Sequence, residues 1–414
     1  MSIHNDAQQM IKSIIADNMP RHAVENALRA HDFCGKIYLV AIGKAAWTMA
    51  QAASDFLGNK LERGIVVTKY DHSQGVLPNI DIYEAGHPVA DEATIAATAK
   101  CIELTQSLGE GDELLFLVSG GGSALFEKPL DGLGLADIQD ATEQLLKSGA
   151  DIVEINMIRK RFSAVKAGRF AQMAAPAKVF AVILSDVLGD RLDSIASGPA
   201  VPDASTVADA QKVVEKYNLQ LNDAQRKYLL EETPKTIDNV KTVITGSVAT
   251  LTAAAEKAAS RLGYTPTVLT TTLNCEAAEA GRLMGSIAAD TDAGRNTFTR
   301  PCAIIAGGET VVTVKGKGKG GRNQELALSA AKAIAGLDGV LIFSLGSDGT
   351  DGPTDAAGGI VDGATIAGLK AKGLDVDKVL ANNDSYTALG AVDGLIVTGP
   401  TGTNVNDVTV ILCR

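Results

Sequence analysis

Short apolar runs alternate along the chain with longer amphipathic segments that are rich in alanine. Several runs are apolar at nearly every position, which is typical of strands buried on both faces of a parallel sheet. The runs span residues 37–42, 64–68, 114–118, 179–184, 240–245, 303–306 and 340–345. Segments with the length and apolar spacing of crossover helices lie between them, at residues 45–56, 91–107, 247–261 and 323–334. This alternation predicts an α/β protein.

Residues 200–240 interrupt the alternation, because they contain no convincing strand. The stretch holds Pro202, two mostly polar helical segments and the run Glu231-Glu232-Thr233-Pro234, and a new strand–helix–strand series begins at Val240. We therefore predict an N-terminal domain of residues 1–238 and a C-terminal domain of residues 239–414. A discontinuous arrangement, in which the first helices pack on the second domain, is equally compatible with the pattern.

Composition narrows the class of protein. The 414 residues are 46% hydrophobic and 21% charged, which describes a folded chain rather than a disordered one. The formal net charge of −11 argues against the broad positive surface that nucleic acid requires. An anionic ligand would therefore need a local concentration of positive charge.

Cysteine usage and hydropathy bear on the compartment. The five cysteines are scattered and never spaced CxxC, which favours reduced thiols over a disulfide framework or a zinc site. The first residues lack the pattern of a signal peptide, and no stretch approaches 18 uninterrupted apolar residues. We expect a cytoplasmic protein that binds small molecules, neither membrane nor nucleic acid, and that is a monomer or a homodimer.

Two glycine-rich loops follow predicted strands in the N-terminal half. Gly43 and Lys44 lie at the start of a predicted helix, where backbone N–H groups and the helix dipole favour a phosphate. The alternative is a tight turn with a solvated lysine. The second loop is Ser119-Gly120-Gly121-Gly122-Ser123. Its glycines cost backbone entropy, so they indicate a ligand that approaches the backbone closely, or else a flexible loop.

A basic cluster and an acidic cluster come next along the chain. The spacing of Arg159, Lys166 and Arg169 places them near one face of a predicted helix, where they can grip a carboxylate or phosphate. A solvated basic face is the commoner explanation. The acidic residues Asp186, Asp190 and Asp193 follow the strand at 179–184. They can hold magnesium, serve as a general base, or simply cap helices.

Two charged loops lie in the C-terminal half. Residues 315–325 read Lys-Gly-Lys-Gly-Lys-Gly-Gly-Arg-Asn-Gln-Glu, an anion-attracting loop in which Arg322 can neutralise a transferring phosphoryl group. The loop also matches the dinucleotide fingerprint formally, but the acidic residue expected about 20 positions further on is missing. Residues 347–355 carry Asp348, Asp351 and Asp355 at a spacing that suits a hard divalent cation.

These stretches together resemble the class II glycerate kinases, whose C-terminal portion is the MOFRL domain. The resemblance covers nearly the whole chain in order. It rests on residues 40–46 (VAIGKAA), 85–89 (AGHPV), 119–125 (SGGGSAL), 184–199 (LSDVLGDRLDSIASGP), 320–325 (GGRNQE), 347–355 (SDGTDGPTD) and 398–407 (TGPTGTNVND).

The resemblance implies a Rossmann-like N-terminal domain and a second α/β domain with a mixed or parallel sheet, with the active site in the cleft between them. It also implies ATP-dependent phosphorylation of D-glycerate at the 2-hydroxyl, with Mg²⁺. Lys44 and Arg322 match the family's proposed phosphate-handling residues. The hypothesis requires the turns that carry them to face one shared cavity.

Site residues follow from the resemblance and the loops. We assign catalysis to Lys44, Arg322 and Asp190, with Asp186 as the other candidate for the general base. The residues assigned to ATP are Gly43, Lys44, Asp186, Gly320, Gly321 and Asn323. The residues assigned to glycerate are Ser119, Gly120, Gly121, Gly122, Ser123, Arg159 and Lys166. The residues assigned to Mg²⁺ are Asp348 and Asp351.

One stretch departs from the family pattern, and two other functions stay open. The family's RKHLS followed by KGG reads here Arg159-Lys160-Arg161-Phe162-Ser163 and Lys166-Ala167-Gly168, which leaves other hydroxy acids open as substrates. A hydroxypyruvate reductase would need a nicotinamide site, and the fingerprint lacks its acidic partner. A non-catalytic protein that closes on an anion between two domains is the alternative of a different class.

Overall fold

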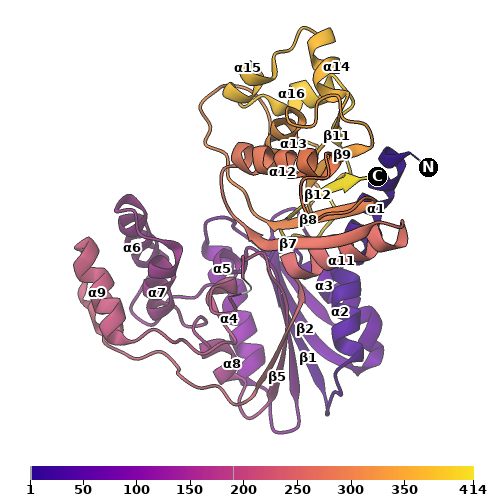
Figure 1. Ribbon diagram of the computed structural model, residues 1–414. Helices are drawn as coiled ribbons and strands as arrows, with labels where there is room; N and C mark the ends of the chain where they lie inside the picture. Colours follow the sequence, from indigo (N-terminus) through magenta and orange to yellow (C-terminus); the bar gives the residue numbers. More distant parts are fainter. Residues whose placement is uncertain (1, 190) are drawn as a thin grey trace. The chain divides into compact units, whose positions relative to one another are not determined.

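The computed structural model describes residues 2–189 and 191–414, and the chain forms two compact units (Figure 1). The parallel-sheet unit comprises residues 23–245, and the mixed-sheet unit comprises residues 1–22 and 246–414. The first residues thus belong with the C-terminal part, which is the discontinuous alternative. The break also falls after the strand that begins at Val240 rather than before it, so this strand ends the first series instead of opening the second.

The parallel-sheet unit is built on a six-stranded sheet of order β3-β2-β1-β4-β5-β6. Its strands are β1 (Ile37–Ile42), β2 (Leu61–Lys69), β3 (Ile80–Ala85), β4 (Glu113–Val118), β5 (Lys178–Leu184) and β6 (Val240–Gly246). The pairings from β3 to β5 are parallel. This is the strand order of dinucleotide-binding folds, in which the order reverses between β1 and β4 and ligands bind at the carboxyl ends beside that point. The Rossmann-like architecture is confirmed.

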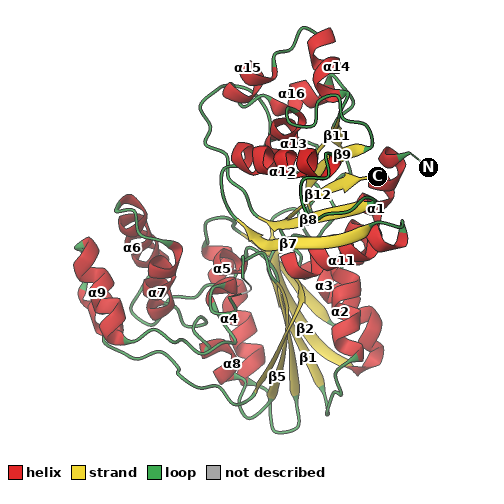
Figure 2. Ribbon diagram, in the orientation of Figure 1, coloured by secondary structure: helices red, strands yellow, loops and turns green. Residues whose placement is uncertain are grey.

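Helices cover both faces of this sheet (Figure 2). The alternation of side chains along β4 sends Leu115 to one core, with Trp47 and Phe180, and Phe116 to the other, with Phe170. The covering helices are α2 (Pro20–Arg29) and α3 (Ala46–Leu57) on one face, and α4 (Glu92–Gln106) and α8 (Arg169–Met173) on the other. Short helices η1 (Gly58–Lys60), α5 (Gly122–Leu125) and η2 (Ile195–Ser197) lie in the connections.

A helical lobe with its own core extends from this unit (Figure 1). Its helices are α6 (Leu135–Lys147), α7 (Ile152–Phe162), α9 (Val207–Tyr217) and α10 (Asp223–Leu229). Residues 200–240 therefore lack a strand up to β6 because they complete this lobe with α9 and α10.

The mixed-sheet unit contains a second sheet, of order β11-β10-β9-β12-β8-β7. The strands are β7 (Thr265–Leu273), β8 (Cys302–Gly308), β9 (Val340–Gly346), β10 (Gly358–Asp362), β11 (Leu395–Ile396) and β12 (Asp407–Cys413). The last strand of the chain, β12, is inserted antiparallel between β8 and β9, whereas β7 and β8 are parallel. Strands β8, β9 and β12 are buried throughout, although β12 pairs antiparallel with both neighbours. An uninterrupted apolar run therefore indicates that both faces of a strand are buried, and it does not indicate the direction of pairing.

Helices cover both faces of the second sheet as well. One face is covered by α1 (Ile3–Asp17) and α11 (Val248–Arg261), and the other by α12 (Ala277–Asp292) and α13 (Arg322–Ala331); α14 (Thr365–Ala371), α15 (Val376–Ala381) and α16 (Ser385–Gly390) complete the unit. Asp6 of α1 accepts hydrogen bonds from Tyr264 (2.8 Å) and Arg414 (3.0 Å). These bonds and the apolar face of α1 hold the first helix in this unit.

Across residues 2–189 and 191–414, no helix combines the length and the apolar character needed to cross a membrane.

Candidate active site

The turn that carries Lys44 lies at the reversal point of the parallel sheet. It follows β1, and the Ser119–Ser123 loop follows the neighbouring strand β4. The Lys44 N–H donates to the Gly120 carbonyl (2.9 Å), and the Ala45 N–H donates to Ser119 Oγ (3.1 Å). Gly43 has φ +111°, and a Cβ added there would lie 2.3 Å from Ser119 Oγ. The two loops are therefore locked together, and only glycine fits at position 43.

Lys44 lies beside His87. His87, in the turn after β3, lies against Gly121, since a Cβ added to Gly121 would be 3.0 Å from the imidazole and 3.2 Å from Lys44 Cγ. Burial, together with the charges of Lys44 and Lys69, lowers the pKa of His87. The imidazole is therefore neutral near pH 7 and can accept a proton or a hydrogen bond. Sequence reasoning gave His87 no role, although the AGHPV stretch after a predicted strand was the available signal.

The glycine loop is held by its own side chains and by Asp186. The Ser119 hydroxyl donates to the Ile42 carbonyl (3.2 Å), and Ser123 Oγ lies 3.0 Å from Ser197 Oγ. Gly121 has φ +83°, and a Cβ added to Gly120 would lie 2.1 Å from Asp186 Oδ2. The Asp186 carboxylate therefore packs directly on the loop, and a side chain at position 120 would displace it. The backbone between Ser119 and Ser123 is thus a fixed platform.

The prediction of one basic helix face is wrong. Helix α7 ends at Phe162, Lys166 lies in a turn, and Arg169 begins α8. Lys166 is fully buried: its ammonium pairs with Glu127 (3.2 Å) and donates to the carbonyls of Ser123 and Phe126 (3.0 Å each). Burial lowers the pKa of Lys166 to about 8, against the opposing charge of Glu127. The Lys166 ammonium thus fixes the end of the glycine loop by its bonds to the Ser123 and Phe126 carbonyls and its pair with Glu127.

Arg159 keeps a donor unused. Its guanidinium donates to the Ser123 carbonyl (3.4 Å), while its Nε is buried and has no hydrogen-bond partner among the described residues. By contrast, Arg161 is buried and donates to the carbonyls of Glu231 and Ser205, and Phe162 lies in the core of the helical lobe. The departure from the family pattern at these two positions therefore serves the packing of the lobe.

The acidic loop after β5 is described in part. Asp190 lies outside the described residues. Asp193 pairs with Arg191 (3.1 Å) and with the buried Lys160 (3.6 Å). Of the two described aspartates, Asp186 is the one that lies against the glycine loop.

Arg322 in the mixed-sheet unit is held by two carboxylates. Its Nε and Nη2 donate to the two oxygens of Asp407 (2.6 and 3.1 Å), and Nη1 donates to Glu309 (2.7 Å). Strand pairing explains this clamp, because Asp407 begins β12 opposite Gly308 and Gly346, the last residues of β8 and β9. Sequence reasoning missed Asp407 and Glu309; the TGPTGTNVND stretch, which ends at Asp407, was the signal.

The two carboxylates of the clamp differ in burial but both favour the charged form of Arg322. Burial raises the pKa of Asp407 to about 6, against the opposing hydrogen bond and charge of Arg322. Burial disfavours the charged guanidinium of Arg322, but the hydrogen bond and charge of Asp407 outweigh it and raise the Arg322 pKa. The Arg322–Asp407 pair is therefore mostly charged at neutral pH and loses the Asp407 charge as the pH falls through about 6. Glu309 is the more exposed partner, with 41% of its side chain accessible.

Asp351 caps the helix that Arg322 begins. Its oxygens accept from the backbone N–H groups of Asn323 (3.2 Å) and Gln324 (2.9 Å), and Asn323 in turn accepts from Ser344 (2.6 Å). Asp348 is half-buried, and its Oδ1 accepts from the Thr350 N–H (2.9 Å). The described residues contain no group of three or more His, Cys, Asp or Glu side chains arranged for a metal ion. This fits Mg²⁺ only in the form in which one or two carboxylates hold it together with substrate phosphates.

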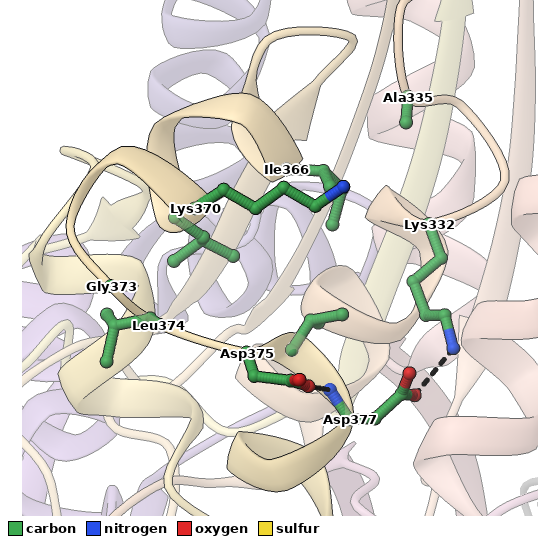
Figure 3. Close-up of a pocket in the computed structure, with 10 residues that line it drawn as sticks. Lys332, Ala335, Ile366, Lys370, Gly373, Leu374, Asp375 and Asp377 are labelled. Atoms are coloured by element: carbon green, nitrogen blue, oxygen red, sulfur yellow. Dashed lines mark hydrogen bonds and ion pairs between the residues drawn. The ribbon is translucent and has the colours of Figure 1, made fainter.

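The mixed-sheet unit has a separate surface pocket between α14, α15 and the end of α13 (Figure 3). Its volume is about 500 Å³, and its lining includes Lys332 and Lys370. Lys332 pairs there with Asp377 at 2.5 Å. No predicted site residue lines this pocket, so it is distinct from the candidate site.

A dinucleotide-type parallel sheet with a lysine turn at its reversal point, joined to a mixed sheet with a clamped arginine, defines a two-unit α/β protein suited to phosphorylated ligands. Residues 6–230 match a domain of unknown function (DUF4147), and residues 302–407 match the MOFRL family. The chain is 53% identical to D-glycerate 2-kinase of Thermotoga maritima over 409 residues, which are 99% of this chain and 98% of that protein.

A solved structure and a further relative complete the comparison. The crystal structure of a glycerate kinase from Thermotoga maritima is 52% identical, matches with a TM-score of 0.97, and covers 99% of each chain. A protein of Agrobacterium vitis named putative hydroxypyruvate reductase is 39% identical over 98% of this chain and 94% of its own length. The chain belongs to the glycerate 2-kinase family that carries a MOFRL domain.

Proposed function

We propose that this protein is an ATP-dependent glycerate 2-kinase that converts D-glycerate to 2-phosphoglycerate and ADP. The observation that carries the proposal is the 53% identity to D-glycerate 2-kinase over the whole chain, which includes both cationic turns. The 39% identical relative named as a putative reductase is more distant. A nicotinamide site is also poorly supported, because the fingerprint glycines at 316 and 318 are packed against residues 382–384.

Lys44 and Arg322 are assigned to the transferred phosphoryl group. The glycerate O2 attacks the γ-phosphorus, a new O–P bond forms, and the bond to the oxygen that bridges to ADP breaks. Fixed cations lower the barrier by offsetting negative charge on the phosphoryl oxygens, and they need no reorganisation during the reaction. The locked Lys44 turn and the clamped Arg322 guanidinium meet this requirement. That the two act on one phosphoryl group stays a prediction.

Glycerate is assigned to the loop of residues 119–123 and to Arg159. Glycerate offers one carboxylate and two hydroxyls, so it needs one cationic anchor and several backbone donors. Arg159 is assigned as the cation, because its guanidinium reaches the Ser123 carbonyl of this loop (3.4 Å). Lys166 acts beneath the loop, where its ammonium fixes the Ser123 and Phe126 carbonyls.

The proton of the 2-hydroxyl is assigned to Asp190 or Asp186. Asp186 is favoured by its position against Gly120 in the glycine loop. Asp348 is the favoured residue for Mg²⁺, since both oxygens of Asp351 accept N–H groups of α13. When bound, Mg²⁺ neutralises and orients phosphate oxygens.

Product analysis by phosphorus NMR tests the proposal. Incubation with D-glycerate and MgATP should give ADP and one phosphomonoester, with the phosphorus coupled to the proton on C2. A 3-phosphate product would overturn the regiochemistry. Oxidation of NADH with hydroxypyruvate, followed at 340 nm, in a preparation that makes no ADP would favour the reductase. Glycerate binding in calorimetry without turnover would favour the non-catalytic binder.

A further inference from the structure

Three lysines precede Arg322 and have no role in the mechanism above. We name Lys315, Lys317 and Lys319 the lysine row. They alternate with Gly316, Gly318 and Gly320 in a segment without helix or strand. All three lysines are exposed.

The glycines of the row pack closely against residues 382–385. A Cβ added at Gly316, Gly318 or Gly320 would lie 2.2, 2.4 and 2.2 Å from atoms of Asn382, Asp384 and Ser385 respectively. Any side chain at these positions would therefore collide with residues 382–385. The lysines occupy the intervening positions, where all three side chains are exposed, and Lys319 lies beside this contact on the ring of Tyr386.

The backbone of the row is fixed by hydrogen bonds. Asn383 Oδ1 accepts from the N–H groups of Lys315 (2.8 Å) and Gly316 (3.0 Å). Asn382 Oδ1 accepts from Lys317 (3.0 Å), and Asp384 Oδ1 accepts from Lys319 (3.0 Å). These four backbone N–H groups therefore already donate hydrogen bonds within the protein. A ligand of this segment must be recognised by the lysine ammonium groups.

The ammonium groups are available for an anion. None of the three forms an ion pair with a carboxylate within the described parts of the chain. Lys319 lies over the ring of Tyr386, 4.5 Å from its centre, which orients its side chain. Side-chain hydrogen bonds lower the pKa of the nearby carboxyls of Glu276 and Asp355, and the charges of Lys315 and Lys319 lower it further without forming ion pairs with them. Three lysines within five residues are still a concentration of positive charge in a protein of net charge −11, and such concentrations attract anions.

We propose that the lysine row binds the polyphosphate chain of a nucleoside triphosphate and delivers its terminal phosphate to Arg322. This inference rests on the proposed kinase function. Lys315 and Lys319 are separated by at most about 14 Å of extended chain, so the row offers several positive charges along a line. A chain of phosphates uses all of them, whereas the single carboxylate of glycerate would use one. Only Gly320 and Gly321 separate Lys319 from Arg322, the first residue of α13.

The test compares a triple variant, K315Q/K317Q/K319Q, with the wild type and with K370Q. Lys370 is an exposed lysine of the same unit that lines the separate pocket (Figure 3). Steady-state kinetics give KM for ATP and for glycerate, and calorimetry gives Kd for ATP and for tripolyphosphate. Circular dichroism and Tm report the fold, which should persist because the substituted side chains are exposed and the fixing bonds use the backbone.

In the triple variant we expect KM and Kd for ATP to rise about tenfold, since each exposed charge pair contributes a modest part of the affinity. The values of kcat and of KM for glycerate should change less than about threefold, and K370Q should match the wild type. The variant K315R/K317R/K319R should retain ATP affinity. The slope of affinity against salt should also be shallower in the triple glutamine variant than in the wild type.

Unchanged Kd for ATP and for tripolyphosphate in the triple glutamine variant would overturn the lysine row as a phosphate site, even in an active kinase. A wild-type protein that forms no phosphoglycerate would overturn the proposed function instead. The calorimetric comparison would then still decide whether the row binds polyphosphate. An equal loss of ATP affinity in K370Q would show a general charge effect and would also overturn the proposal.

Discussion

The two cations assigned to phosphate sit in opposite electrostatic surroundings. Lys44 in the parallel-sheet unit lies beside His87, whose pKa is lowered by burial and by the charge of Lys44, and the Lys44 carbonyl lies 3.3 Å from His72 Nδ1. Lys44 has no carboxylate within ion-pair distance in the described chain. Arg322 in the mixed-sheet unit is held by Asp407 and Glu309. Position is fixed by the backbone in the first case, through the Lys44 N–H and the Gly120 carbonyl. In the second it is fixed by side chains.

This difference shows two ways of preparing a positive charge. A lysine ammonium is a compact point charge on a flexible stem, so its turn must be rigid for the charge to be well placed. A guanidinium has a planar set of donors, so carboxylates can hold one edge while other N–H groups stay available. The cost at Arg322 is that Glu309 competes with any phosphate for the same cation. Each prediction below separates the two arrangements.

Removing either cation should have the largest effect on activity. We expect Lys44→Ala and Arg322→Ala each to lower kcat by about 10²–10³-fold, the loss typical when one fixed charge-stabilising group is removed. Arg322→Lys should rescue little, because lysine cannot hold the edge-on pair with Asp407. Steady-state ADP formation measures kcat, and Lys60→Ala is the control for loss of an exposed lysine. Near-normal turnover in both alanine variants would remove these roles.

Substitution of Gly43 should disturb the rigid lysine turn. Gly43 and Gly75 have similar φ values, +111° and +118°, but an added Cβ at Gly75 meets no atom within 4 Å. Gly75→Ala should therefore cost about 1–3 kcal/mol for the backbone conformation alone. Gly43→Ala should cost roughly 1–3 kcal/mol more, because the Cβ collides with Ser119. The free energy of unfolding in denaturant measures both; equal losses would show that the Ser119 contact is not tight.

Neutralising Asp407 should loosen the arginine clamp and alter its pH dependence. We expect Asp407→Asn to lower kcat about tenfold at pH 8, since a hydrogen bond to a charged group contributes about 1.5–3 kcal/mol. In the wild type, Asp407 becomes neutral as the pH falls through about 6, so kcat should fall in this pH range. A plot of kcat against pH should not show this fall for the variant. If kcat of the variant falls at the same pH as kcat of the wild type, the titrating group is not Asp407.

The same carboxyl makes a prediction for stability. Burial raises the folded-state pKa of Asp407 above its unfolded value of 3.8. The folded state therefore binds more protons between about pH 4 and pH 6, and the contribution of this group to stability declines as the pH rises through that window and is level above it. Asp407→Asn should remove this decline, which thermal unfolding at a series of pH values measures.

Releasing the exposed partner of Arg322 should have the smallest effect. Glu309→Gln removes the competitor for the Nη1 donor, so KM for ATP should fall by up to about threefold, the range expected of a partly exposed ion pair. The value of kcat should hardly change, because Asp407 still positions the guanidinium. Asp377→Asn, which frees Lys332 elsewhere in the unit, is the control. A rise in KM would show that Glu309 helps to place Arg322.

The α/β class and the positions of the glycine loops could be predicted because they depend on local pattern. The apolar runs at 37–42 and 114–118 became β1 and β4, and the turns after them lie side by side. The basic helix face could not be predicted, because helical spacing assumes an unbroken helix and α7 ends at Phe162. Sequence could not show either that Lys166 is buried on Glu127, a residue 39 positions away.

By itself the sequence determined the apolar strands β1, β2, β4, β5, β6, β8 and β9, the glycine-rich turns, and the places where cations follow strands, since these features depend on neighbours in the chain. It did not show β3, β7, β10, β11 or β12. Tertiary structure alone decided that β12 enters the middle of the second sheet, which brings Asp407 onto Arg322. It also decided that α1 joins the C-terminal part of the chain. The physical reason is that strand order and buried charge pairs depend on contacts between residues far apart in the chain, 85 positions for Arg322 and Asp407, and these contacts are selected by the packing of the whole unit.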